Sequence, residues 1–509
     1  MRAPVSSGER SADPFTIGPW VSNRAITDPE RVAIVFEGQS MTYWQLNESS
    51  TDVARALLSL GMSPGDRVGT LTENRPEHVI LLFACAKAGL TLFPMNWRLT
   101  NAELVEQLIL IEPSILLVSA TQRVRAEGMS DPIHTAVLLL EEFCTDAKSS
   151  VGVSDLPTVS GDDGLMIIAT SGTTGRPKGV LLTHANFFWT NLSLDLVAPI
   201  TFSDVVLQVL PQFHVGGWNV QPMLAWWKGA TVILESSFEP ERVLEVVARE
   251  RVTTMAGVPT TYLMMGTHAN FSESDLSSLR YVVVGGASMP QTLLHRWHDK
   301  GVAVLQGYGL TEAAPNVFCL GADDAIEHPG SVGHPYPYVD VALVTPGGCL
   351  GEATEQVELW VRGPCLFAGY WRDLEATEAV MKNGWLRTGD VARRDDDGYY
   401  RIVGRTKEMF VSGGENVYPV EVENVITAFP GVFSAGVVWV DDPIWGEAGV
   451  AFVERAPGAL IDLDALSEHC RARLAAYKIP VRFHVVDQLP RSPVGKLNKI
   501  ALRASAEAE

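Results

Sequence analysis

The segment Thr170-Ser171-Gly172-Thr173-Thr174-Gly175-Arg176-Pro177-Lys178-Gly179 is the most informative stretch of this 509-residue chain. It follows the apolar run 165–169, so we expect a loop that leaves a buried strand. Its glycines allow close approach of the backbone, its hydroxyls and amides can donate to phosphate oxygens, and Lys178 adds a positive charge. The spacing does not fit the GxxxxGK[ST] pattern of P-loop proteins. The segment predicts a polyphosphate site of another kind, or simply a flexible turn.

The composition limits the possible partners. Hydrophobic residues make up 46% and charged residues 19%, as in ordinary globular proteins. The net charge of -21 argues against a nucleic-acid partner, because nucleic acids are bound by basic surfaces. The N-terminus is polar and no run approaches the ~20 apolar residues of a membrane span. The six cysteines include no CxxC pair, so we expect neither disulfides nor a metal cluster, and a cytoplasmic protein.

Apolar runs typical of strands alternate with helical patterns through most of the chain, which predicts an α/β fold. We expect a buried helix over 79–88, a strand over 90–95 and a helix over 239–250 with Pro240 in its first turn. A further strand over 280–284 ends at Gly285-Gly286.

The likeliest domain boundary lies near residue 400. Asp397-Gly398 predicts a hairpin between strands 389–393 and 399–403. The tail beyond it is long enough for a separate small domain, and one of its helices should bury Leu463, Leu466, Cys470 and Leu474 on one stripe. We therefore predict a flexible N-terminal tail (1–14), a large domain (15–404) and a small mobile α+β domain (405–509).

Five further segments carry groups suited to nucleotide and acyl chemistry. They are PQFHVGG (211–217), QGYGLTE (306–312), WLRTGD (385–390), GRTKE followed by SGGENVYP (404–419), and PRSPVGK (490–496). In this order, and together with 170–179, they resemble the signature of the adenylate-forming (AMP-binding, ANL) superfamily, which includes acyl-CoA synthetases, 4-coumarate:CoA ligases, luciferases and adenylation domains of peptide synthetases. The resemblance extends from about Asp28 to Leu502.

The resemblance implies an ATP-dependent acid:CoA ligase that uses Mg²⁺ and coenzyme A. It assigns catalysis to Lys178, Thr311, Glu312 and Lys496, with Glu312 as the magnesium carboxylate. Without the resemblance, each of these residues would have an ordinary structural interpretation. Thr311-Glu312 would begin a helix, Tyr308 would belong to the core, Asp390 would lie in a turn, and Lys496 would be a surface lysine. The residues that it implies for ATP and AMP are Thr170, Ser171, Gly172, Thr173, Thr174, Lys178, Gly286, Ala287, Gln306, Gly307, Tyr308, Thr311, Asp390, Arg405 and Lys496.

For the acyl group the resemblance implies a site at His214, Gly216, Gly217, Gly285 and Ala287. A packed histidine is as consistent with the sequence at 214 as a functional one. The neighbouring Met223, Trp218, Trp226 and Trp227 could line an acyl tunnel, although core packing is the better prediction. The resemblance also implies CoA contacts at Gly413 and Gly414 and a hinge at Lys407.

The sequence departs from the family pattern at three places. Ala169 replaces a tyrosine common before the Thr-Ser-Gly run, and Val494 replaces a small or hydroxyl residue before Gly495-Lys496. Gly216-Gly217 stand where the phenylpropanoid ligases carry a bulky aromatic residue, which argues against a strict 4-coumarate ligase.

Two rival functions stay open. One is a stand-alone acyl-AMP ligase that loads a carrier protein, and the other is a non-catalytic nucleotide-binding protein. The CoA ligase is favoured because the 412–414 turn resembles that of free CoA synthetases and the chain ends at Glu509, which leaves no room for a carrier domain. The acid is expected to be hydrophobic, whether fatty, aryl or polycyclic. The oligomeric state stays open, a homodimer included.

Overall fold

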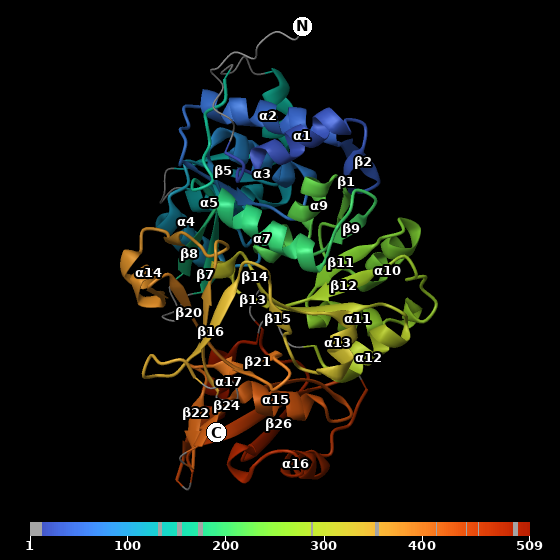
Figure 1. The fold of residues 1–509 in the computed structure, drawn as a ribbon, viewed down its shortest axis with the longest axis vertical. Helices are drawn as coiled ribbons and strands as arrows, with labels where there is room; N and C mark the ends of the chain where they lie inside the picture. Colours follow the sequence, from blue (N-terminus) through green and yellow to red (C-terminus); the bar gives the residue numbers. More distant parts are fainter. Residues whose placement is uncertain are drawn as a thin grey trace.

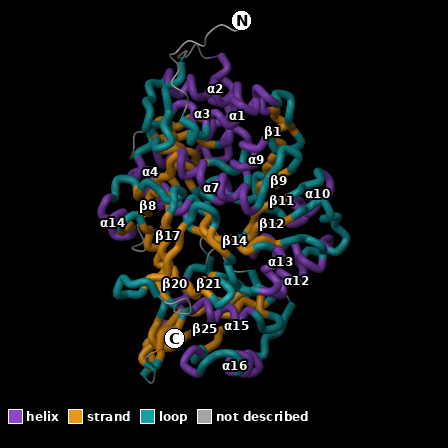
Figure 2. The backbone as a smooth tube through the Cα atoms, in the orientation of Figure 1, coloured by secondary structure: helices purple, strands orange, loops and turns teal. Residues whose placement is uncertain are grey.

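The computed structural model describes residues 13–130, 135–149, 155–171, 177–286, 289–351, 356–413, 415–443, 445–456, 458–491 and 497–508. A large N-terminal part, with sheets covered by helices, stands above a smaller C-terminal part (Figures 1 and 2). Strands β20 (Trp385–Arg394) and β21 (Tyr400–Arg405) lie where the two parts meet. The predicted α/β architecture is confirmed.

The first large sheet has seven strands in the order β18-β8-β7-β4-β3-β5-β6. β3 pairs in parallel with β4 and β5, whereas β7 and β8 form an antiparallel pair. The predicted helix over 79–88 and strand over 90–95 are confirmed as α3 and β4, and every residue of α3 from His78 onward is buried. The elements are α2 (Tyr43–Ser59), β3 (Arg67–Leu71), α3 (Pro76–Ala88), β4 (Thr91–Met95), α4 (Asn101–Ile111), β5 (Ile115–Val118), α5 (Arg123–Ser130), β6 (Ala136–Leu139), α6 (Leu140–Asp146), β7 (Gly164–Ser171), β8 (Pro177–Thr183) and β18 (Gly369–Tyr370).

The second sheet has nine strands in the order β15-β14-β13-β12-β11-β9-β10-β1-β2. Its central strands are parallel, so their carboxyl ends meet at one edge. The predicted helix over 239–250 and strand over 280–284 are confirmed. The elements are α1 (Gly18–Thr27), β1 (Val32–Phe36), β2 (Gln39–Thr42), α7 (His184–Val197), β9 (Val205–Gln208), α8 (Gly216–Asn219), α9 (Pro222–Lys228), β10 (Thr231–Leu234), α10 (Pro240–Arg249), β11 (Thr254–Gly257), α11 (Pro259–Thr267), β12 (Tyr281–Val284), α12 (Gln291–Asp299), β13 (Val304–Gly309), β14 (Asn316–Leu320), α13 (Ala322–Glu327) and β15 (His334–Pro335).

A third, antiparallel sheet closes the large part and contains the predicted hairpin. β20 and β21 pair across the Asp397-Gly398 turn, where Gly398 has a φ of 92°. β21 ends at Arg405, so the first residue predicted for the small domain still belongs to this sheet. The other elements are β16 (Asp340–Val344), β17 (Val357–Arg362), α14 (Leu374–Val380) and β19 (Met381–Lys382).

The C-terminal part has its own five-stranded sheet and its own core, which begins at Phe410. The predicted stripe is wrong at one position, because Leu463 is the first residue after the N-cap of α16 and its exposed fraction is 40%. Leu466 and Cys470 are fully buried, and Leu474 is buried beyond the helix end. The elements are β22 (Phe410–Ser412), β23 (Glu415–Val417), α15 (Pro419–Thr427), β24 (Val432–Asp442), β25 (Gly446–Arg455), α16 (Leu463–Arg471), β26 (Arg482–Val486) and α17 (Lys499–Glu507).

The tryptophan-rich segment after residue 217 belongs to the core, as predicted. Trp218, Met223 and Trp226 are fully buried. Trp227 is partly buried and stacks on Trp20 with ring centroids 4.6 Å apart. Among the helices that the structure describes, none is long and apolar enough to cross a membrane.

The N-terminal segment is attached to the large part before its first helix. The Asp13 carboxylate accepts hydrogen bonds from the backbone N–H groups of Phe15 and Gly161, at 3.0 and 2.7 Å. Of the predicted tail (1–14), residues 1–12 lie outside the described residues. The backbone N–H of Ile17 donates to Nδ1 of His184 at 3.1 Å. This bond requires an unprotonated Nδ1, and burial lowers the pKa of His184 to about 4.

The buried His184 predicts a pH dependence of stability. Its pKa is lower in the folded protein than in the unfolded chain, so between about pH 4 and 6.5 the unfolded chain binds more protons. Stability from this residue is therefore complete above pH 6.5 and falls as the pH falls, by up to about 1.4 kcal/mol per pH unit. His184→Asn keeps an acceptor for the Ile17 N–H but does not titrate. The melting temperature of the native protein should fall relative to that of the variant from pH 6.5 to pH 4.5; parallel curves would contradict this account.

Candidate active site

The end of strand β13 determines the centre of the site. A Cβ atom on Gly309 would lie 1.5 Å from the carbonyl oxygen of Pro315, so only glycine fits here. The N–H of Leu310 donates to this same oxygen at 3.1 Å, which closes the turn over 310–315. Nδ2 of Asn219 donates to the carbonyl of Ala314 at 2.6 Å. The turn is thus fixed at both ends, and it holds Thr311 and Glu312 at the edge of the nine-stranded sheet.

Three side chains from distant parts of the sequence meet beside this turn. The hydroxyl of Tyr370 donates to Oε1 of Glu312 at 2.9 Å. The ammonium of Lys178 lies 4.6 Å from the centroid of the Tyr370 ring. A carboxylate can bind a metal ion, and a lysine can bind a phosphate group. Because both contact the same tyrosine, the two could bind a metal–phosphate group together. We call Lys178, Glu312 and Tyr370 the phosphate corner.

A second group of side chains surrounds Asp390. Its Oδ2 accepts a short hydrogen bond from the hydroxyl of Tyr308, and its Oδ1 lies 2.9 Å from Nε of Arg405. The N–H of Asp390 donates to Oγ1 of Thr388 at 3.0 Å. Burial, followed by the Asp390 charge, raises the pKa of Tyr308, so its hydroxyl keeps the proton that it donates. Each carboxylate oxygen can accept another hydrogen bond, so Asp390 can still receive two hydroxyls of a ribose.

We call this second group, Tyr308, Asp390 and Arg405, the nucleoside corner. Tyr308 and Glu312 come from one strand end, four residues apart, and so join the two corners. Figure 1 shows this strand and β21 near the junction of the large and small parts. The nucleoside and phosphate sites predicted from the sequence are therefore adjacent in the structure.

The glycine-rich segment is described only at its two ends. β7 continues through Thr170 and Ser171, and β8 begins at Pro177. The two strands are antiparallel, and Thr170 lies opposite Lys178. The predicted residues Gly172, Thr173, Thr174, Ala287, Gly414 and Lys496 lie outside the described residues.

The glycines predicted for the acyl site differ in the room around them. A Cβ on Gly217 would lie 2.2 Å from the Pro211 carbonyl oxygen, so close backbone packing already requires glycine there. A Cβ on Gly216 would make only ordinary contacts, the nearest with Val220 at 3.7 Å, and one on Gly285 would lie 3.6 Å from the Gly307 carbonyl oxygen. His214 is half-buried and packs on Phe213. A methyl group would therefore fit at Gly216 and at Gly285, but not at Gly217.

The link to the small part is short. The N–H of Glu408 donates to the carbonyl of Arg405 at 3.0 Å, and the Glu408 carboxylate pairs with Lys499 at 2.9 Å. Lys499 also pairs with the partly buried Glu423 at 2.9 Å. Lys407, the predicted hinge, is exposed between Arg405 on one sheet and Glu408 on the other part.

The predicted CoA residue Gly413 has a φ of 61°, and a Cβ there would lie 2.8 Å from the Trp445 ring. Both the backbone conformation and the close ring therefore favour glycine at this position. These constraints hold whether or not CoA contacts the turn.

The carboxylates present fit Mg²⁺ bound together with a nucleotide. Within the described ranges, no group of three or more His, Cys, Asp or Glu residues could hold a metal by itself. Glu312 offers a single carboxylate, which is what Mg²⁺ takes when phosphates and water supply most of its ligands. ATP would bring these phosphates to the turn.

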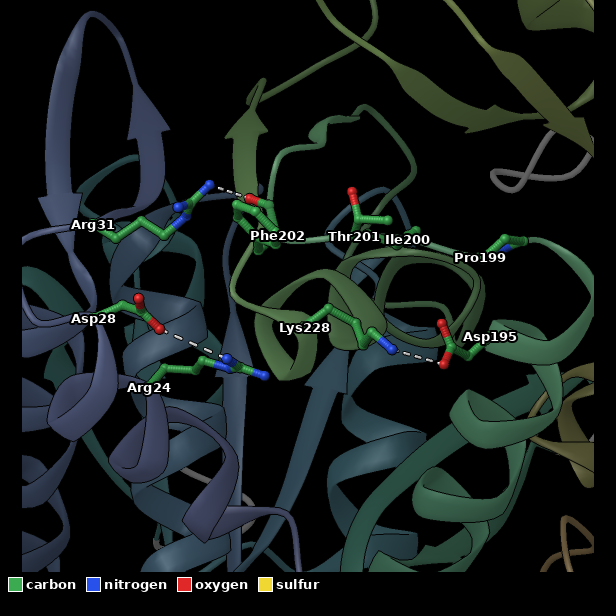
Figure 3. Close-up of a pocket in the computed structure, with 9 residues that line it drawn as sticks. All are labelled: Arg24, Asp28, Arg31, Asp195, Pro199, Ile200, Thr201, Phe202 and Lys228. Carbon is green, nitrogen blue, oxygen red and sulfur yellow. Dashed lines mark hydrogen bonds and ion pairs between the residues drawn. The ribbon is translucent and has the colours of Figure 1, made fainter.

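A large cleft lies elsewhere in the protein, between α1, α7, α9 and the loop before β9 (Figure 3). Its volume is about 660 Å³, and it contains none of the residues predicted for chemistry. Most of its charges neutralise one another, because Lys228 pairs with Asp195 at 2.8 Å and Arg24 lies 3.7 Å from Asp28. We do not assign the reaction to it.

Tyr370 was missed in the sequence. It lies between Gly369 and Trp371 in an apolar run, and its partner Glu312 is 58 residues away. Nothing local indicates this contact, which forms only when β18 pairs with β8. Asn219 was missed for the same reason, because its partner Ala314 is 95 residues away. Thr388 is different, since it lies in the predicted segment 385–390, only two residues from Asp390.

A large α/β part whose sheet edge carries the residues predicted for a nucleotide, followed by a small C-terminal part, is typical of the adenylate-forming class. Residues 21–371 match the family model "AMP-binding enzyme", and residues 421–496 match "AMP-binding enzyme C-terminal domain". The chain belongs to this family and is an AMP-forming acid:CoA ligase.

Similar proteins cover nearly the whole chain. A feruloyl-CoA synthase of Amycolatopsis sp. is 40% identical over 96% of this chain and 98% of that protein. The indoleacetate–CoA ligase of Aromatoleum aromaticum is 34% identical over 95% and 97%. The structure of o-succinylbenzoate CoA synthetase from Bacillus subtilis with ATP and magnesium has a TM-score of 0.87, at 31% identity over 95% of this chain and 99% of that one.

The two adjacent glycines 216 and 217 provide a matched test of the site. Gly217→Ala should lower the melting temperature by at least about 2–4 °C, because its methyl group would overlap the Pro211 carbonyl and overpacking costs about 1–3 kcal/mol. Gly216→Ala should melt like the native protein, since its methyl group has room. Differential scanning fluorimetry measures both, and equal melting temperatures would contradict the distinction.

Proposed function

We propose that the acid is a planar aryl acid of the arylpropenoic type, such as ferulate, and that the product is its CoA thioester. The observation that carries this proposal is the 40% identity to a feruloyl-CoA synthase over 96% of the chain. The lack of side chains at Gly216 and Gly285, where even a Cβ would make only ordinary contacts, supports it, because a rigid ring needs a site without intruding side chains. We also propose a cytoplasmic location, which the six free cysteines support.

In the first step a carboxylate oxygen of the acid attacks the α-phosphorus of ATP, and the bond to pyrophosphate breaks. Two anions must approach one another, so positive charge and oriented donors are needed where charge develops. Lys178 and Lys496 supply positive charge, and the Thr311 hydroxyl donates to the α-phosphate. Mg²⁺, held by Glu312, neutralises phosphate charge when it is bound.

The nucleoside corner holds the same nucleotide by its other end. Asp390 accepts from the ribose hydroxyls, while Tyr308 offers its ring to adenine and Arg405 keeps Asp390 in place. These contacts leave the reacting phosphate beside the turn over 310–315. Binding energy from the nucleoside is thereby used to position the phosphate.

In the second step the CoA sulfur attacks the acyl carbonyl carbon, the bond to AMP breaks, and the thiol proton is lost to solvent. We propose that the small domain turns at Lys407 between the steps. This would remove Lys496 and bring the turn at Gly413 and Gly414 to the acyl-AMP. The ordered connection from β21 through 406–409 supports a turn at this point, because few residues link the two parts.

The acid preference can be tested with a panel of ferulate, indoleacetate, palmitate, acetate and malonate. Burial of an aromatic ring is worth about 1.5–3 kcal/mol, so acetate should be roughly 10- to 100-fold poorer in kcat/KM than ferulate. Malonate should be poor as well, because its second carboxylate would be desolvated. Gly216→Tyr should selectively reduce the activity with ferulate. A preference for acetate or malonate would refute the aryl proposal, and product formation only with a carrier protein would refute CoA as the acceptor.

The two half-reactions should respond separately to two variants. Lys496→Ala should abolish acyl-AMP formation but still convert supplied acyl-AMP to the thioester, since the lysine acts only while carboxylate and phosphate approach. Gly414→Leu should form acyl-AMP normally but react slowly with CoA. Pyrophosphate exchange and thioester formation from synthetic acyl-AMP measure the two steps. Equal loss of both steps in each variant would contradict the two-conformation mechanism.

A further inference from the structure

Tyr370 contacts both charged side chains of the phosphate corner. Its hydroxyl bonds to the Glu312 carboxylate at 2.9 Å, and its ring faces the Lys178 ammonium at 4.6 Å. Glu312 and Lys178 form no ion pair with one another in the described part of the chain. A direct pair would satisfy the two charges and leave less of each for a ligand. The tyrosine therefore occupies the position that keeps them separate.

The surrounding backbone fixes Tyr370 firmly. The N–H of Tyr370 donates to Oγ1 of Thr377 at 2.9 Å, and Thr377 donates in turn to the carbonyl of Asp373 at 2.8 Å. On either side, the N–H groups of Ala368 and Trp371 donate to carbonyl oxygens of β8, at 2.9 and 2.7 Å. Such support is typical of a residue whose orientation matters for a site.

The same segment also holds the backbone of Glu312. The N–H of Phe367 donates to the Glu312 carbonyl at 2.9 Å, and the Phe367 ring packs edge-on against Tyr370. Both the main chain and the side chain of Glu312 are thus positioned by residues 367–370.

We propose that Tyr370 is the positioning residue of the phosphate corner: its hydroxyl orients Glu312 toward the Mg²⁺ of bound ATP, and its ring holds Lys178 ready for a phosphate. The proposal rests on the functions proposed above for Glu312 and Lys178. The two functions can be tested separately, because the hydroxyl orients the metal ligand Glu312 and the ring positions Lys178. Tyr370→Phe removes only the first, and Tyr370→Leu removes both.

The test measures ATP binding rather than turnover. Isothermal titration calorimetry on the full-length enzyme, without the acid, gives the affinity for ATP over a series of Mg²⁺ concentrations and in EDTA. The half-effect concentration is the Mg²⁺ concentration that gives half of the maximal increase in ATP affinity. Tyr370→Phe should raise it by roughly 10- to 100-fold, as is usual when the partner of a metal ligand is lost. Its affinity for ATP in EDTA should not change. Tyr370→Leu should show the same shift and should also bind ATP more weakly in EDTA.

A double-mutant cycle shows whether Tyr370 acts through Glu312. Glu312→Gln should itself raise the half-effect concentration of Mg²⁺. Adding Tyr370→Phe to it should cause no further shift, because both substitutions remove the same Tyr370–Glu312 interaction. Tyr338→Phe is the matched control, since Tyr338 is exposed, and it should bind like the native enzyme.

Three outcomes would overturn the proposal. If Tyr370→Phe leaves the Mg²⁺ dependence unchanged while Glu312→Gln alters it, only the inference on Tyr370 is refuted. Multiplicative effects in the double variant would show that Tyr370 does not act through Glu312. An unchanged Mg²⁺ dependence in Glu312→Gln would refute both this inference and the metal function proposed for Glu312.

Discussion

The close contact between Gly309 and the carbonyl of Pro315 is the constraint on which the site depends. Because a Cβ would lie 1.5 Å from that oxygen, the chain can fold back directly at the end of β13. Tyr308 is thereby left on the strand and Glu312 on the turn, each facing a different partner. A wider turn would separate the nucleoside corner from the phosphate corner. One backbone contact thus sets the spacing at which a nucleotide can be held by both of its ends.

The charges of the protein are arranged around this spacing. The chain has a net charge of -21, yet its expected ligands are anions. In the cleft between α7 and α9, Lys228 is neutralised by Asp195. In the phosphate corner, by contrast, an aromatic ring rather than a carboxylate faces Lys178. The charge of Lys178 is therefore available to an anion, although the net charge of the protein repels anions.

Much of the fold could be predicted because its signals are local. The fully apolar run of α3, Pro240 at the start of α10 and Asp397-Gly398 in the β20–β21 turn each determine their element within a few residues. Ordered motifs also predict residues for the nucleotide, and three of these, Tyr308, Asp390 and Arg405, contact one another in the structure. Tyr370 could not, because its partner is 58 residues away. The packing constraint on Gly217 could not be predicted either, because the sequence does not distinguish a glycine needed for close backbone packing from one that leaves space for a ligand.

The linker between the two parts is short. Arg405 is the last residue of a paired strand, and Glu408 is already bound to Lys499 of the terminal helix, which is also bound to Glu423. Any rotation between the parts must be absorbed by the backbone dihedrals of Thr406 and Lys407. In the proposed rotation, a small change of angle would produce a large displacement at the far end of the small part. Asp390 and Arg405 would stay with the large part, so the contacts proposed between Asp390 and the nucleotide would not have to break.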